Sequence, residues 1–298
     1  MMRARESALL LALAALPARA ETPASSYLAE LAAWRAGREA GLRSDTGWLT
    51  VAGLFWLEPG RTPFGSGPDC PVRLPPSAPA HAGELELAEG RVRYTLAQGV
   101  AASIDGRPAP RQGALRADRE GEPTVLAFGP VTLSVLQRGE RVGVRVKDRE
   151  SAARRQFEGL AWYPASEQWR VEARFVPHHA PHTVAVPNVL GQVQEMPSPG
   201  YVVFSVQGRE LRLDPVLEAP DAEQLFFIFR DGTTGRTTYS AGRFLYADQP
   251  RDGRVVLDFN KAYSPPCAVT PWATCPLPPK QNRLDVAIEA GERHTGRH

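Results

Sequence analysis

Short runs of β-favouring residues between glycine and proline turns recur through most of the chain, and they restrict the fold to sheets. The 298 residues include 26 Gly and 28 Pro without a repeating period. Regular short strands with such turns are typical of a β-sandwich or a barrel. We therefore expect a mainly β fold, with a β-sandwich over residues 61–150. The candidate strands there are 70–74, 83–88, 91–96, 100–104, 124–128, 130–137 and 141–147.

A second β-rich half is expected over residues 151–298, beyond a charged junction at 147–155. Residues 225–229 are apolar throughout, which predicts a strand buried on both faces. The segment 282–288 is interpreted as the last strand. Since 43% of the residues are hydrophobic, the chain can bury a substantial core.

The first 20 residues have the pattern of an export signal. Two arginines precede a short apolar core at 8–17, and Ala18-Arg19-Ala20 forms a cleavage motif. The apolar core is too short for a helix that spans a membrane. We expect cleavage after Ala20 and an exported, soluble mature protein, periplasmic or secreted, without a membrane span.

Residues 21–60 are expected to hold a helix followed by an apolar strand. Apolar residues such as Tyr27 and Leu31 recur at near-helical spacing. This pattern predicts an amphipathic helix over 27–42 that docks on the body of the protein. The stretch 48–57 is apolar and aromatic, which predicts a buried strand.

The overall charge and the motifs exclude several classes of partner. The net charge of +2 gives no general attraction for nucleic acid or anionic membranes, so neither partner is expected. The sequence has no phosphate loop or dinucleotide fingerprint, and we predict no cofactor. The loop from His178 to His182 holds three histidines among prolines, without a carboxylate or thiol. No metal site is therefore predicted there, and the role of the loop is left open.

The most distinctive segment is a proline-rich loop that holds two of the three cysteines. Cys267 and Cys275 are eight residues apart, and in an exported protein this spacing predicts a disulfide. The bridge and the prolines together would make the loop nearly rigid. Cys70 is left over and is expected to be a buried apolar thiol. The prolines are Pro265, Pro266, Pro271, Pro276, Pro278 and Pro279.

The candidate ligand site lies in the same region. In a strand, Asp258 and Asn260 would share one face, and Lys261 and Tyr263 the other. A cationic side chain can hold an anion, whereas tyrosine and asparagine can orient a polar ligand. The alternative is that these side chains only hold the loop through hydrogen bonds. The candidate ligand-binding residues are Arg243, Asp258, Asn260, Lys261, Tyr263, Asn282 and Arg283.

Three functions remain open from these residues. The first is a binding or accessory module with a polar, anion-binding site near residues 258–283, for a small polar ligand or an envelope component. The second is a hydrolase that uses Asp258, Lys261 or Tyr263, and the third is a structural envelope module. The sequence has no nucleophile elbow and no zinc-protease motif, so enzymatic activity stays undecided.

Several segments, spread over nearly the whole mature chain, resemble the DUF1684 family. Because that family is named for its unknown function, the resemblance implies no reaction. Ser264 and Trp272 depart from the family pattern, which has Asn and Tyr there, without removing an ionisable group. The segments are GWLTVAGLFWL at 47–57, AGRFLY at 241–246, LDFNKAY at 257–263, PCA at 266–268, CPLPP at 275–279, NRL at 282–284 and AGE at 290–292.

Residues 62–148 also resemble a forkhead-associated sandwich in the spacing of their turns. That family reads phosphothreonine with an Arg directly after a Gly, and with a Ser three residues before a His. Here Ser66 follows Gly65, and Ser77 lies four residues before His81. Because a bidentate clamp on phosphate needs a guanidinium, this resemblance implies the sandwich fold and not phosphopeptide binding.

Overall fold

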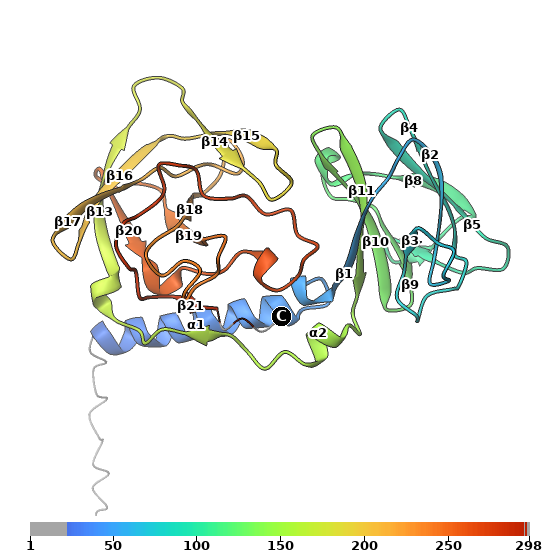
Figure 1. The fold of residues 1–298 in the computed structure, drawn as a ribbon, viewed down its shortest axis with the longest axis horizontal. Helices are drawn as coiled ribbons and strands as arrows, with labels where there is room; N and C mark the ends of the chain where they lie inside the picture. Colours follow the sequence, from blue (N-terminus) through green and yellow to red (C-terminus); the bar gives the residue numbers. More distant parts are fainter. Residues whose placement is uncertain (1–22, 295, 297–298) are drawn as a thin grey trace, which may run out of the picture.

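The computed structural model describes residues 23–294 and residue 296, so the predicted export signal lies outside the described residues. The fold is mainly β, as predicted, with one long helix at its N-terminal end (Figure 1). No helix of the described part is long and apolar enough to cross a membrane. The helices are α1 (Pro23–Arg43), α2 (Ala152–Arg155) and the short 3₁₀ helices η1 (Trp48–Thr50), η2 (Asp118–Glu120), η3 (Glu167–Trp169), η4 (Phe259–Lys261) and η5 (Pro266–Ala268).

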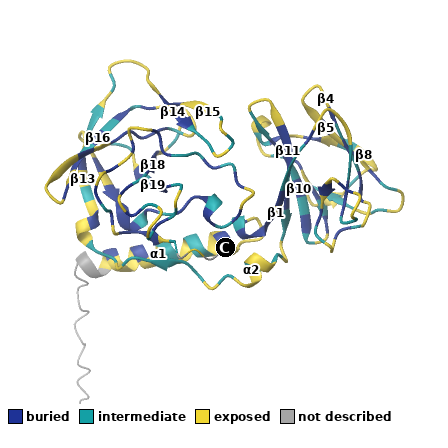
Figure 2. Cartoon of the chain, viewed as in Figure 1, coloured by how far each residue is buried: buried dark blue, intermediate teal, exposed yellow. Residues whose placement is uncertain are grey.

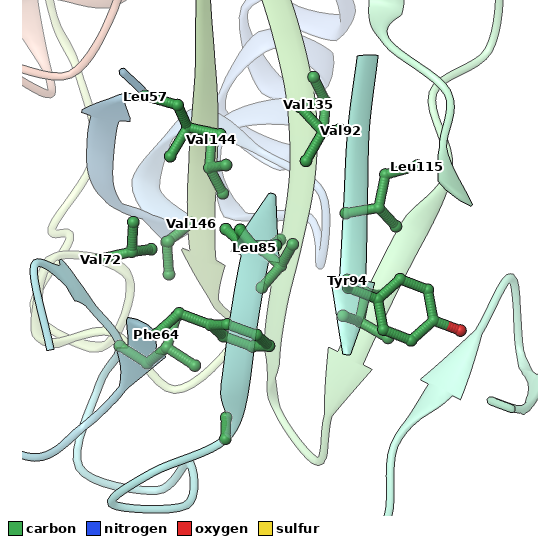
Figure 3. Close-up of a cluster of buried hydrophobic side chains, with 14 of the residues drawn as sticks. Leu57, Phe64, Val72, Leu85, Val92, Tyr94, Leu115, Val135, Val144 and Val146 are labelled. Atoms are coloured by element: carbon green, nitrogen blue, oxygen red, sulfur yellow. The ribbon is translucent and has the colours of Figure 1, made fainter. Parts of the chain in front are cut away.

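Residues 51–148 form what we call the first β unit, in which two sheets enclose one core. One sheet has the order β1-β11-β10-β9-β6-β7 and the other β3-β2-β4-β5-β8. Alternate residues of each strand point inward, as Phe64, Leu85 and Val144 do in Figure 3. The strands are β1 (Val51–Trp56), β2 (Gly60–Gly65), β3 (Val72–Arg73), β4 (Gly83–Ala88), β5 (Arg91–Leu96), β6 (Ser103–Ile104), β7 (Arg107–Pro108), β8 (Gln112–Leu115), β9 (Val125–Phe128), β10 (Val131–Arg138) and β11 (Arg141–Asp148).

Residues 161–293 form the second β unit, which is built from one larger sheet and three strand pairs. The larger sheet has the order β17-β16-β13-β20, and the pairs are β12-β21, β14-β15 and β18-β19. The strands are β12 (Ala161–Trp162), β13 (Arg170–Pro177), β14 (Thr183–Pro187), β15 (Val193–Pro197), β16 (Gly200–Val206), β17 (Arg209–Leu213), β18 (Gln224–Phe229), β19 (Arg243–Asp248), β20 (Arg254–Asp258) and β21 (Glu292–Arg293).

Strand β18 lies at the centre of the second unit and is buried on both faces, as its uninterrupted apolar sequence predicts. Phe227 and Phe229 pack into the main core of the unit. Phe226 and Ile228 point the other way, into a smaller core that the β14-β15 pair and the Cys/Pro loop complete. The second unit therefore has two apolar layers separated by the β18-β19 pair.

The segment 282–288 is not a strand, so this part of the prediction is wrong. Its backbone bends at residues 285–286. Leu284 donates to the carbonyl of Arg230 at 2.8 Å, while Gly232 donates to that of Val286 at 2.7 Å. These isolated bonds do not form a ladder. The alternating burial that suggested a strand arises because every second residue packs into the core.

Helix α1 docks on the second β unit rather than on the neighbouring first unit (Figure 1). Leu31 and Leu42 of the helix are buried, while its outer face stays exposed (Figure 2). Arg38 forms an ion pair with Glu292 at 2.7 Å, and Glu39 accepts a hydrogen bond from the backbone of Leu160 at 3.0 Å. The predicted docking is confirmed, and the helix joins residues from both ends of the chain.

Candidate functional site

Asp258 and Asn260, which the sequence placed in a ligand site, hold helix α1 instead. The Asp258 carboxylate accepts from the hydroxyl of Tyr27 at 2.9 Å and from the backbone N–H of Asn260, so it caps η4. The Asn260 side chain is fully buried and bonds to both backbone groups of Ser166. Every polar group of this cluster has a partner within the protein, which leaves none directed at a ligand.

Lys261 lies at the rim of the same contact and pairs with Glu30 of the helix at 2.6 Å. Glu30 is 66% exposed, so the pair adds little to stability. Burial, and next the Asp258 carboxylate, raise the pKa of Tyr27 well above its ordinary value. These residues form a docking contact for α1 with a neutral phenol at its centre.

Arg243, Asn282 and Arg283 lie in other places. The Arg243 guanidinium is buried, forms an ion pair with Asp231 and donates to the carbonyl of Ile288 at 2.9 Å. The Asn282 side chain binds the backbone N–H and C=O of Asp214, each at 2.8 Å. Arg283 is exposed. The first two anchor the C-terminal segment to the second unit.

Tyr263 belongs to an aromatic cluster that also includes the charged side chains of Arg38 and Glu218. Its ring stacks on that of Tyr246 at 6.3 Å, and the guanidinium of Arg38 lies 4.3 Å from the ring centre. The hydroxyl of Tyr246 donates to Glu218 at 2.7 Å. Burial raises the pKa of Tyr263 to about 12, against an opposing effect of Arg38.

Stability should fall at alkaline pH because of these phenols. The pKa values of Tyr27, Tyr246 and Tyr263 are all raised in the folded protein above the ordinary value of 10.0. Folded protein thus holds phenol protons more tightly than unfolded protein, so their contribution is complete below pH 10.0 and is lost as pH rises through about 12. Urea unfolding across this window should give a decreasing free energy, with a shallower decrease for Tyr263→Phe. If the free energy of unfolding falls equally steeply for Tyr263→Phe and for the wild type, the Tyr263 phenol does not contribute to this pH dependence.

The predicted disulfide is not formed in the structure, where Cys267 and Cys275 are free thiols. The backbone N–H of Cys267 donates to the sulfur of Cys275 at 3.2 Å, and the Cys267 thiol donates to the carbonyl of Ala273. The prolines restrict the backbone angles of the loop without the bridge. The two cysteines lie close together, as predicted, but the predicted disulfide bond between them is not present.

The remaining cysteine and the histidine loop show no metal centre. Cys70 is buried, as predicted. His178 and His182 stack with ring centres 4.1 Å apart. No group of three or more His, Cys, Asp or Glu side chains with metal-binding geometry occurs in the described part of the chain.

A groove between η1, the linker after α2 and the Cys/Pro loop is the candidate functional site. We call it the junction groove. Its volume is about 750 Å³, which lies in the range of small-molecule sites. Three stretches far apart in sequence meet there, together with the end of η1. Its lining comprises Leu49, Ala153, residues 156–161, residues 268–269 and residues 292–294.

The junction groove is amphipathic. Leu49, Phe157, Leu160 and Val269 supply apolar surface, whereas the short strand β21 and the residue after it supply the polar part. The β21 backbone is fixed because Gly291 has φ +79°, and a Cβ there would lie 2.3 Å from the carbonyl oxygen of Ala262. Glycine is the residue that tolerates both conditions.

The polar end of the groove has defined partners. Glu292 is buried and paired with Arg38, so its charge is neutralised. The guanidinium of Arg293 lies 5.3 Å from the ring centre of Tyr163. The ring of His294 meets that of Tyr239 edge-on at 5.1 Å. Arg293 and His294 each contact an aromatic ring and both line the groove, where they can bind an anionic group.

Sequence reasoning missed this groove because its residues carry no motif. The stretch from Phe157 to Tyr163 reads as an ordinary strand, and residues 292–298 read as a frayed tail. Composition had directed attention to residues 258–283, of which only Ala268 and Val269 line the groove. A smaller hollow of about 300 Å³ lies in the first unit beside Trp56 and Arg141.

Comparisons with known proteins support the resemblance over the second half of the chain. A family model described as "Protein of unknown function (DUF1684)" matches residues 155–293. Among solved structures, an uncharacterised protein of Haloarcula marismortui is 33% identical, with coverage of 49% of this chain and 81% of that chain and a TM-score of 0.42. The comparison with curated proteins gives no match.

Proposed function

This chain belongs, through residues 155–293, to the DUF1684 family of proteins of unknown function, and we propose that it is a binding module. Its ligand is a small amphipathic molecule with one anionic group, and its site is the junction groove. The observation that carries the proposal is the size and two-sided lining of that groove. An apolar body contacts Phe157, Leu160 and Val269, while the anionic group meets Arg293 and His294.

The charges of the groove limit the ligand class. Arg293 is exposed at the rim and carries the only Arg or Lys charge of the described lining. Glu158 on the opposite segment adds a negative charge, which disfavours a ligand with several anionic groups. One carboxylate on an apolar body satisfies both conditions, because the guanidinium fork matches carboxylate geometry.

Binding is favoured over catalysis by the same residues. The described lining contains no Ser, Thr, Cys or Lys, so it offers no side chain of the types that form covalent intermediates most often. Glu292 is committed to Arg38 at 2.7 Å, which removes it as a general base. Of the residues proposed for a hydrolase, Asp258 and Lys261 are engaged with helix α1, and the ring of Tyr263 contacts Arg38 of the same helix.

The proposal is tested with decanoate and 1-decanol as an anionic and a neutral amphipathic probe. Calorimetric titration of the wild-type protein should show binding of both, with decanoate the tighter. Val269→Trp fills the groove and should weaken both affinities by about tenfold or more, or about 1.4 kcal/mol. Arg293→Gln should weaken decanoate binding while decanol binding is unchanged. Val256→Trp, at an exposed position on β20, is the matched control and should bind like the wild type.

The outcomes distinguish the alternatives. Failure of the wild type to bind either probe overturns the amphipathic ligand class, and equal binding by Val269→Trp overturns the location. Thermal unfolding of each variant establishes that it is folded before its affinity is compared.

A further inference from the structure

The Cys/Pro loop brings two thiols into contact on a rigid support. Eight residues separate them in sequence, and the backbone N–H of Cys267 reaches the sulfur of Cys275 at 3.2 Å. The carbonyl of Cys267 accepts from the hydroxyl of Tyr239 at 2.9 Å, and that of Cys275 accepts from the backbone of Val189 at 3.1 Å. Both backbones are therefore anchored, in positions that keep the two cysteines close together.

The two thiols have unequal environments. Cys267 is partly exposed, whereas Cys275 is 4% exposed. The hydrogen bond from Cys275 lowers the pKa of Cys267 to about 7, and the same bond followed by burial raises the pKa of Cys275. Since the thiolate is the nucleophile, Cys267 is the member that reacts first with an external group.

Arg145 supplies positive charge from the first β unit. It extends from β11, and its guanidinium lies 5.0 Å from the ring centre of Trp48. Two of its nitrogens, Nε and Nη2, are buried without a hydrogen-bond partner. Its charge lowers the pKa of Cys275 against the effect of burial. A guanidinium with unused donors can stabilise an anion, and the Cys275 thiolate is an anion that the charge of Arg145 favours.

We propose that Cys267 and Cys275 are a reversible dithiol–disulfide pair that exchanges with small external disulfides. The Cys267 thiolate attacks one sulfur of the external disulfide, whose S–S bond breaks, and the leaving thiolate takes a proton from solvent. Cys275, whose thiolate the Arg145 charge favours, then loses its proton to solvent, attacks the Cys267 sulfur and expels the second external thiolate. The two cysteines lose two electrons and two protons, and the external disulfide becomes two thiols.

This role differs from a structural bridge and from a metal site. A permanent bridge would leave no thiolate for the charge of Arg145 to stabilise, and the prolines already restrict the loop. A zinc site would need two more ligands, and no such group occurs among the described residues. The geometry of an accessible attacking thiol and a buried resolving thiol instead suits two-step exchange.

The test equilibrates the full chain in glutathione buffers over a range of ratios of reduced to oxidised form. Acid quenching, alkylation and peptide mass mapping then report each cysteine. We expect a Cys267–Cys275 bridge that forms and disappears with the ratio. Cys275→Ala should accumulate glutathione on Cys267, whereas Cys267→Ala should leave Cys275 unmodified. Arg145→Met should slow bridge formation several-fold, and Arg141→Met on the same strand should not.

Each other outcome overturns the proposal. Two thiols that stay alkylatable at every ratio exclude the exchange, and a bridge that excess reduced glutathione does not open is structural. Equal glutathione labelling of both single variants refutes the assignment of attacking and resolving roles. Equal rates for Arg145→Met and the wild type refute the role of the guanidinium.

Discussion

Asp231→Ala should lower the free energy of unfolding by about 3–5 kcal/mol, the usual cost of breaking a buried ion pair from one side. The Arg243 side chain is 1% exposed, and that of Asp231 is fully buried. Removal of the carboxylate leaves the guanidinium charge buried without compensation. The same guanidinium holds the carbonyls of Ile288 and Ala290, so the C-terminal segment should loosen as well. Urea unfolding followed by tryptophan fluorescence measures the effect.

An exposed ion pair provides the matched control. Arg209 and Asp285 are 55% and 64% exposed, so Asp285→Ala should cost less than about 1 kcal/mol. Asp231→Leu combined with Arg243→Met removes both charges and should recover much of the lost stability. A loss for Asp231→Ala no larger than that of the control would show that the buried pair does not stabilise the fold.

Asn282→Ala should lower the free energy of unfolding by about 3 kcal/mol, because several buried backbone groups lose their partners at once. The amide of Asn282 binds the N–H and C=O of Asp214 and also donates to the carbonyl of Ile228 at 3.0 Å. Water cannot replace it readily, since the residue is 1% exposed. The result is measured by the same urea unfolding.

The adjacent residue is the control for this variant. Gln281 is exposed, so Gln281→Ala should change stability by no more than about 0.5 kcal/mol. If Asn282→Ala behaves like Gln281→Ala while its ligand affinity changes, Asn282 belongs to a binding site as its sequence context first suggested. A large stability loss with unchanged affinity supports the anchoring role.

Local patterns predicted much of the secondary structure. The predicted strands 83–88 and 91–96 coincide with β4 and β5, because alternation and turn residues are encoded within a few positions of each other. The apolar run at 225–229 correctly indicated a buried strand. The prediction for segment 282–288 failed because irregular chain that packs every second residue into a core shows the same apolar alternation as a strand. The spacing resemblance to forkhead-associated domains stays a prediction.

The candidate site was harder to predict for a physical reason. A cluster of acid, amide and amine has the same composition whether it faces a ligand or a helix. What decides the role of Asp258 and Asn260 is the hydroxyl of Tyr27, which lies 231 residues from Asp258 in sequence. The junction groove in turn arises from short segments whose residues are ordinary one by one. Neither fact is encoded in any local window.

Helix α1 precedes the first β unit in sequence but packs on the second, so the first β unit is an insertion within the domain that α1 and the second unit form. The chain enters the first β unit at Val51 and leaves it next to Val51, because Val51 is paired with Lys147 near the end of β11. Across the same exit, Ser151 donates to the carbonyl of Leu49 at 2.6 Å. Helix α1 and the second β unit thus form one domain, and the first β unit is inserted into its sequence between them. Residues 155–293, expressed alone, would lack helix α1 of their own domain and would expose the surface that Tyr27 and Leu31 cover.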